Sequence, residues 1–260
     1  MHPELFTIGN FTVHTYGFMI MIGAILGFLY FTISVKKDLG IEREPVQNLA
    51  ILVILSAVIG GKVFFYLEDP IHYLSSWDLM KRNFRTGFVV YGSLIFAIPL
   101  VVWYFRKYKW PVWPMLDRVA ISACLIHGTG RLGCFFAGCC HGVEADVPWA
   151  VTFVNVGSKA PLHTPLHPTQ LYSSGMIYGI LMILLMFKRH KRFEGQLFFM
   201  YIILYAIGRA VIEIYRGDEE RGYVIDNVLS HSQFISVIVI AIVAWVYVRF
   251  KGKASSKAES

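Results

Sequence analysis

Long apolar runs separated by short polar segments make up most of this chain. Seven of the runs approach the roughly 20 residues that a transmembrane helix needs to cross a bilayer. They cover residues 13–35, 48–67, 88–105, 113–130, 169–187, 195–212 and 233–250. The fourth run carries Asp117 and Arg118 in its first turns, and the sixth has polar side chains in its C-terminal half. The pattern predicts an all-α polytopic membrane protein with about seven transmembrane helices and outer-side loops that form the site.

The composition agrees with a membrane environment. Of the 260 residues, 56% are hydrophobic and 16% are charged, whereas soluble domains carry about a quarter charged residues. The mean hydropathy is +0.55. Because one soluble core cannot bury this much apolar surface, we expect a single transmembrane domain over residues 1–250 and a polar cytoplasmic tail over 251–260.

The basic residues gather in alternate connections between the runs. Fourteen Lys and Arg lie in segments 36–43, 106–109, 188–192 and 249–257, against five in 81–85, at 159 and at 221. The positive-inside rule therefore predicts an N-terminus outside the membrane and a C-terminus in the cytoplasm. The long connections 131–168 and 213–232 then lie on the outer side. Since the net charge of +7 sits in short loops between spans, we expect no nucleic-acid partner.

Four polar residues near the end of the sixth run form the first candidate site. Tyr205, Arg209, Glu213 and Arg216 are spaced by four, four and three residues, which places them on one face of a helix. A charged side chain in the bilayer centre costs at least about 2.5–3.5 kcal/mol, so such a residue is expected to have an ion-pair partner or a functional role. Guanidinium groups oriented by a carboxylate suit a phosphate. The alternative is a series of ion pairs within the helix that stabilise one another and bind no ligand.

The segment from His127 to Gly142 forms the second candidate site. It is rich in glycine and contains Arg131. Because glycine weakens a helix by about 1 kcal/mol relative to alanine, we expect irregular backbone here that lines a cavity and approaches an anion. The alternative is helix packing through small residues, followed by a turn.

Weaker signals accompany these two segments. In the run from His163 to Tyr172, His167 is a candidate proton acceptor or a structural histidine, and Thr169 a candidate helix cap. Tyr16-Gly17 and Tyr91-Gly92-Ser93 lie near span ends, where interface aromatics are common. The spacing of Gly23 and Gly27 is typical of a helix-packing face.

The four cysteines allow three interpretations. Cys124, Cys134, Cys139 and Cys140 lie within 17 residues, near His127 and His141. A metal site, a disulfide and simple packing are all compatible with this spacing, but no Cys-x-x-Cys pair occurs. We favour packing and expect neither a metal nor an organic cofactor.

Taken in order, these segments resemble the prolipoprotein diacylglyceryl transferase family over most of the chain. The matching features are Tyr16-Gly17, Gly92-Ser93-Leu94-Ile95, Asp117, Gly130-Arg131 with Gly133, Phe135 and Gly142, Pro148-Trp149, His167 to Tyr172, the column from Tyr205 to Arg216, and Ser232-Gln233. Four positions depart from the family's pattern. Cys134 and Cys139 replace an Asn and an acidic residue, Tyr91 replaces a His, and Ser173 replaces a Glu. The resemblance therefore leaves the general base unassigned.

The resemblance implies an enzyme of the bacterial inner membrane. It would transfer the diacylglyceryl group of phosphatidylglycerol to the lipobox cysteine of a prolipoprotein signal peptide and release glycerol phosphate. The implied catalytic residues are Arg131, Arg209, His167, Tyr205 and Glu213. The implied phosphatidylglycerol-binding residues are Arg131, Arg209, Arg216, Tyr16, Tyr91, Gly92 and Gly142. Two alternatives stay open: a carrier of an anionic lipid or small anion, and a thiol-redox or metal protein built on the cysteines.

Overall fold

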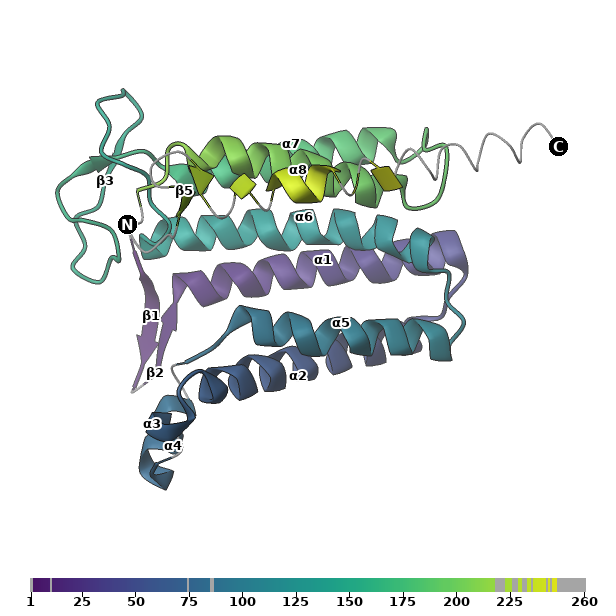
Figure 1. The fold of residues 1–260 in the computed structure, drawn as a ribbon, viewed down its shortest axis with the longest axis horizontal. Coiled ribbons are helices and arrows are strands. Elements are labelled where there is room, and N and C mark those ends of the chain that lie inside the picture. Colours follow the sequence, from purple (N-terminus) through teal and green to yellow (C-terminus); the bar gives the residue numbers. More distant parts are fainter. Residues whose placement is uncertain are drawn as a thin grey trace. The chain divides into compact units, whose positions relative to one another are not determined.

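The computed structural model describes residues 2–9, 11–73, 75–84, 87–217, 223–225, 229–230, 233–234, 236–241, 243 and 245–246. The chain forms two compact units, Met1–Phe31 with Trp113–Ser260, and Thr32–Val112. The elements, drawn in Figure 1, are β1 (Glu4–Ile8), β2 (Phe11–His14), α1 (Thr15–Leu39), α2 (Arg43–Glu68), α3 (Pro70–Tyr73), α4 (Trp77–Phe84), α5 (Val90–Lys107), α6 (Val112–Ala137), β3 (Val151–Thr152), β4 (Pro165–Leu166), α7 (Thr169–Phe187), α8 (Gln196–Glu213), β5 (Tyr223–Ile225) and β6 (Leu229–Ser230).

The helices confirm the predicted class of an all-α polytopic membrane protein. Among the described residues, five helices are long and apolar enough to cross a membrane, namely α1, α2, α6, α7 and α8. They coincide with five of the predicted spans, and α5 coincides with the predicted span 88–105. The predicted span 233–250 lies partly outside the described residues, and those described there are helical. The count of seven spans stays a prediction.

Helix α6 is longer than its glycine content suggested. We expected irregular backbone from about residue 128, but the helix continues to Ala137. Two of its glycines have close neighbours: a Cβ on Gly128 would meet the ring of Tyr178, and one on Gly133 would lie 3.0 Å from the carbonyl oxygen of Tyr16. Close packing on both sides thus offsets the low helix propensity of glycine. The connection to α7 begins at Gly138, whose φ is +75°.

In the first unit, α1, α6, α7 and α8 lie side by side (Figure 1). Gly23 and Gly27 of α1 face α6, because a Cβ on Gly23 would lie 3.1 Å from the Cα of Ile126, and one on Gly27 would meet that side chain. This confirms the predicted packing face. Helices α6, α7 and α8 enclose a core of Ala120, Ile121, Cys124, Ile177, Ile180, Leu184 and Leu197.

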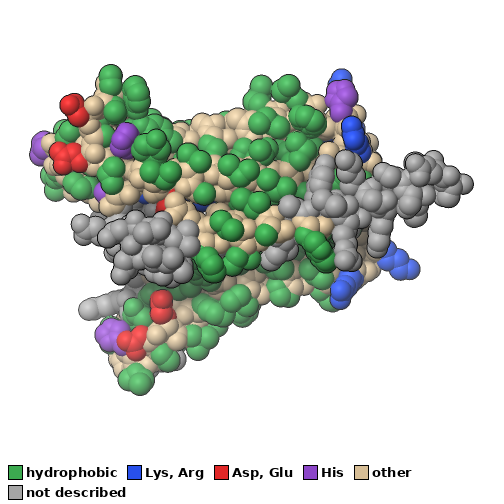
Figure 2. Space-filling model, turned by 45° about the horizontal axis from the view of Figure 1, so that its top comes forward, with side chains coloured by type: hydrophobic (Ala, Val, Ile, Leu, Met, Phe, Trp, Pro, Cys, Tyr) green, Lys and Arg blue, Asp and Glu red, His purple; other side chains and the backbone are tan. Residues whose placement is uncertain are grey.

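A buried carboxylate fixes the start of α8. Asp117 of α6 accepts hydrogen bonds from the backbone N–H of Gly195, at 3.0 Å, and of Phe198, at 3.2 Å. Lys191 in the α7–α8 connection donates a third, at 3.1 Å. A negative charge among the free N–H groups of a helix start is favourable. In Figure 2 basic side chains lie at the end of the unit where α7 and α8 join, beyond apolar side chains along the helices.

The connection between α6 and α7 contains short β-structure that the sequence did not predict. Strands β3 and β4 pair antiparallel, with Val151 opposite Leu166. Bridges also join Glu144 to Leu166 and Gly142 to Arg216. Phe153, Ala160 and Leu166 form a small buried core beneath this layer. The predicted outer connection is therefore an ordered cap that ties the ends of α6 and α8 to the start of α7.

The second unit is built on the pairing of α2 with α5. Gly60 and Gly92 meet where the helices cross, and Ser93 donates a hydrogen bond to the carbonyl oxygen of Ala57 at 2.7 Å. A side chain at position 92 would collide with α2. Tyr91 is 75% exposed. Helix packing thus accounts for Gly92, and contact of either residue with a lipid stays a prediction.

Candidate active site

One face of α6 carries the polar residues nearest its C-terminal end. His127, Arg131 and Cys134 are spaced by four and three residues, so the helix directs them to the same side. The Cys134 side chain is buried, and those of His127 and Arg131 are partly buried. The glycines around them let α1 and α7 approach closely, which keeps these side chains inside the bundle.

The last two turns of α8 supply a second group. Arg209 forms an ion pair with Glu213 one turn later, and these side chains are 17% and 6% exposed. Tyr205 lies one turn before Arg209 on the same face. The prediction that the helix also carries Arg216 was wrong. Because α8 ends at Glu213, the chain turns through Ile214 and Tyr215, and Arg216 forms a β-bridge with Gly142.

These groups on α6 and α8 meet at one end of the first unit. The rings of His127 and Tyr205 lie 5.1 Å apart between centroids. His127 interacts electrostatically with both Arg131 and Arg209, and Arg131 interacts in the same way with Tyr205. Two guanidinium groups from different helices therefore share one neighbourhood, which is a strong attractor for an anion.

The β-layer brings the third arginine toward this place. Gly142 accepts Arg216 as its bridge partner, and its own N–H donates to the carbonyl oxygen of His167 at 2.9 Å. A Cβ on Gly142 would lie 2.6 Å from the carbonyl oxygens of His167 and Tyr215, so only glycine fits. The predicted Gly142 thus holds two segments together, and a direct contact with lipid stays a prediction. The guanidinium of Arg216 interacts electrostatically with Cys140.

His167 belongs to a chain of aromatic and hydroxyl groups on the cap. Its Nδ1 lies 3.0 Å from the hydroxyl of Tyr172, which also accepts a hydrogen bond from Nε1 of Trp149 at 2.6 Å. The ring of Tyr215 lies 5.2 Å from the ring of His167. This arrangement fixes the His167 ring and gives it a neighbour that can exchange a proton.

The first turn of α7 orders the backbone between α6 and the cap. Thr169 is the first residue of α7 and its hydroxyl donates to the carbonyl oxygen of Cys140 at 2.7 Å, so the predicted role of a side-chain helix cap was wrong. Gln170 is fully buried, and its amide donates to the carbonyl oxygen of Cys139 at 2.8 Å. Its Oε1 has no hydrogen-bond partner among the described residues.

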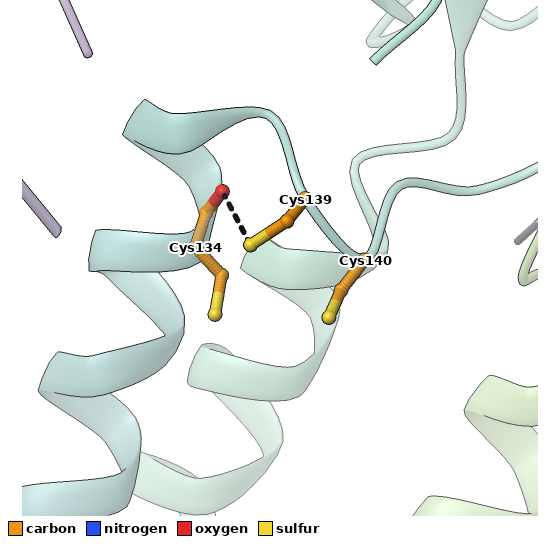
Figure 3. Close-up of side chains that lie close together, drawn as sticks. All are labelled: Cys134, Cys139 and Cys140. Atoms are coloured by element: carbon orange, nitrogen blue, oxygen red, sulfur yellow. Dashed lines mark hydrogen bonds between the residues drawn. The ribbon is translucent and has the colours of Figure 1, made fainter. Parts of the chain in front are cut away.

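Three of the four cysteines gather at the same end of α6. Figure 3 shows the sulfur atoms of Cys134, Cys139 and Cys140 close together, all within 4.8 Å of one another. Hydrogen bonds with the thiols of Cys134 and Cys139, and then the charge of Arg216, lower the pKa of the Cys140 thiol. Tyr16 at the start of α1 interacts electrostatically with these thiols and with Arg131. All four cysteines are free.

The structure thus brings together Tyr16, Arg131, Arg209, Tyr205, Glu213 and Arg216 in the first unit, with His127 and three cysteines that had no predicted catalytic role. The spacing of His127 and Arg131 by four residues could have identified the histidine, had α6 been expected to continue. The clustering of cysteines in the sequence indicated a thiol group, but which three sulfur atoms meet depends on the turn at Gly138. Chemically, the arrangement can hold a phosphate and stabilise a departing oxyanion.

Comparison with known proteins agrees with this chemistry. The sequence matches the family of the description "Prolipoprotein diacylglyceryl transferase" over residues 3–249. The chain belongs to this family. It is 36% identical over 247 residues to the phosphatidylglycerol–prolipoprotein diacylglyceryl transferase of Clostridium tetani, covering 95% of this chain and 97% of the relative. Similar enzymes of Clostridium perfringens (34% identity over 92% of each chain) and Clostridioides difficile (32%, over 97% of this chain and 98% of the relative) also match.

Membership in this family and the helices described above make the chain a multi-pass membrane protein. The relatives take their names from a transferase reaction between phosphatidylglycerol and a prolipoprotein.

Proposed function

We propose that this protein transfers the diacylglyceryl group of phosphatidylglycerol to the lipobox cysteine of a prolipoprotein signal peptide. The observation that carries the proposal is the convergence of Arg131 and Arg209 on His127 from two helices. The family and the names of the relatives support the same reaction. An anion carrier would use the same arginines, but the family's description and the names of these relatives support a transferase.

The reaction needs a thiolate nucleophile and a stabilised phosphate leaving group. The sulfur attacks the glycerol carbon of the diacylglyceryl group as the bond from that carbon to the phosphate oxygen breaks. The electron pair leaves with the oxygen, which departs as glycerol phosphate. The protein must therefore position the two substrates, hold the phosphate, and remove the proton of the thiol.

In this proposal the arginines bind the phosphate group of the lipid. Arg131 and Arg209 bind its oxygens through charge-assisted hydrogen bonds that strengthen as negative charge develops. Glu213 orients Arg209 through their ion pair. Arg216, held by its bridge to Gly142, adds positive charge at the cap. In this proposal Tyr205 and Tyr16 donate hydrogen bonds to phosphate or glycerol oxygens.

His167 is the proposed proton acceptor among the residues predicted from the sequence. Its Nδ1 contacts the Tyr172 hydroxyl, so a proton can pass between them. We also propose that the enzyme lies in the bacterial inner membrane with its N-terminus outside. Figure 1 supports this placement within the first unit, because the Lys- and Arg-rich connection between α7 and α8 lies at the end opposite the cap.

A transfer assay tests the proposal. The purified protein is incubated with phosphatidylglycerol and a peptide that contains a lipobox cysteine. We expect the peptide to gain the mass of the diacylglyceryl group and an equal amount of glycerol phosphate to be released. A peptide with serine in place of cysteine is the control and should gain nothing. If the folded protein leaves the cysteine peptide unmodified, the proposed reaction is wrong.

A further inference from the structure

The end of α6 and the turn that follows it direct three thiols to one point. The Sγ atoms of Cys134, Cys139 and Cys140 lie within 4.8 Å of one another (Figure 3). In a tetrahedral zinc site, Zn–S bonds of about 2.3 Å place sulfur atoms about 3.8 Å apart. The thiols therefore need to close by at most about 1 Å, which side-chain rotation can provide. Cys139 would give up a weak hydrogen bond to the Cys134 carbonyl oxygen.

The backbone that presents the two adjacent cysteines is held in an unusual conformation. Gly138 has φ +75° and Cys140 has φ +58°. The left-handed conformation costs a residue with a side chain about 1–3 kcal/mol, so surrounding contacts must maintain it. Thr169 and Gln170 of α7 do so by donating hydrogen bonds to the carbonyl oxygens of Cys140 and Cys139. The arrangement is therefore preorganised, as binding sites are.

The surrounding charge suits an anionic complex. Arg131 interacts electrostatically with Cys134 and Cys140, and Arg216 with Cys140. Three thiolates and a divalent cation carry a net charge of about −1, which these guanidinium groups balance. Sulfur ligands select thiophilic ions such as Zn²⁺ over Mg²⁺ or Ca²⁺. Within the described part of the chain, the group contains three ligands, and three protein ligands leave one position of a tetrahedral ion open.

We propose that Cys134, Cys139 and Cys140 bind a thiophilic divalent cation such as Zn²⁺, whose open position takes the thiol of the acceptor cysteine. The second half of this statement rests on the proposed function. A thiol that coordinates Zn²⁺ loses its proton. That proton passes to the base, for which His167 is proposed above, and the metal-held sulfur then forms the new bond to the glycerol carbon as the bond from that carbon to the phosphate oxygen breaks. This site would hold the acceptor sulfur as a thiolate, and it departs from the sequence-based expectation that no metal is bound.

Cobalt binding tests the site without any transfer reaction. The reduced, chelator-treated protein is titrated with Co²⁺, whose bonds to thiolates produce characteristic charge-transfer absorption. We expect one equivalent to bind and Zn²⁺ to displace it. Cys139→Ser and Cys140→Ser should lose the absorption. The control Cys124→Ser, in the core between α6, α7 and α8, should keep it. Circular dichroism of each variant checks that the helices are retained.

A second experiment, with the lipobox peptide, tests whether the open coordination position of the metal takes the acceptor thiol. Adding the lipobox peptide to the cobalt-loaded protein should change the absorption, whereas the serine peptide should not. If the wild-type protein binds no cobalt, or binds it equally well as a folded Cys139→Ser variant, the metal site is refuted. If cobalt binds but the two peptides act alike, the role in holding the acceptor is refuted. Neither result depends on transfer, so failure of the proposed function is recognised separately.

Discussion

Variants of the ion pair between Arg209 and Glu213 distinguish a role in stability from a role in catalysis. The two side chains are 17% and 6% exposed, so loss of one charge is costly for the other. We expect Arg209→Met alone to destabilise the protein by about 3–5 kcal/mol, because it removes one ion-pair partner of a buried carboxylate. The double variant Arg209→Met with Glu213→Leu should recover most of this loss, since apolar residues of similar size replace a buried pair at little net cost.

Activity should not recover with stability. Loss of one preorganised donor to a developing oxyanion costs about 2.7–4 kcal/mol, which corresponds to a rate lower by about 10²–10³. We therefore expect the double variant to be nearly as stable as wild type and nearly inactive. Unfolding followed by tryptophan fluorescence in detergent measures the stability, and transfer of the diacylglyceryl group measures the activity.

A matched pair at the surface provides the control. Lys36 and Glu42 are 3.3 Å apart but 50% and 74% exposed. Replacing both should change stability by less than about 1 kcal/mol and leave transfer unchanged. If the stable Arg209→Met and Glu213→Leu double variant transferred lipid at the wild-type rate, the pair would be a salt bridge that only satisfies itself, and the functional reasoning would fail.

Three further variants test other parts of the account. Gly23→Leu should destabilise the protein by about 1–3 kcal/mol by forcing α1 from α6, whereas Gly179→Leu, where a Cβ meets nothing within 4 Å, should not; equal thermal midpoints would contradict the packing. Asp117→Asn should lower the thermal midpoint by weakening bonds to Lys191 and the start of α8, and an unchanged midpoint would speak against this role. His167→Gln should lower transfer by about 10²–10⁴ if the imidazole carries the proton; a wild-type rate would leave the metal-held thiol as the better candidate.

Much of the fold followed from the apolar runs, because a bilayer imposes helix lengths that are visible in a sequence. Helix α7 has the predicted bounds, and the packing face at Gly23 was predicted from spacing alone, although its partner α6 was not. The end of α6 was not predicted. Its glycines suggested irregular backbone, but close contacts with Tyr16 and Tyr178 keep it helical. Those contacts are tertiary and leave no local signal.

The site was predicted in part for the same reason. Arg209 and Glu213 share a helix face that spacing reveals. The placement of Arg216 depends on where α8 ends and on the bridge to Gly142, which joins residues far apart in the sequence. The thiol group depends on the turn at Gly138 and on hydrogen bonds from α7. Such features become visible only when the chain is folded.

The proposed reaction depends most on the binding of the lipid phosphate by guanidinium groups. The direct test is the transfer rate of Arg131→Lys and of Arg209→Lys, with Arg189→Lys in the exposed α7–α8 connection as the control. Lysine keeps the charge but loses the planar fork, so we predict rates about 10–100-fold lower for the two site variants and an unchanged rate for the control. Wild-type rates in folded Arg131→Lys and Arg209→Lys would contradict the claim.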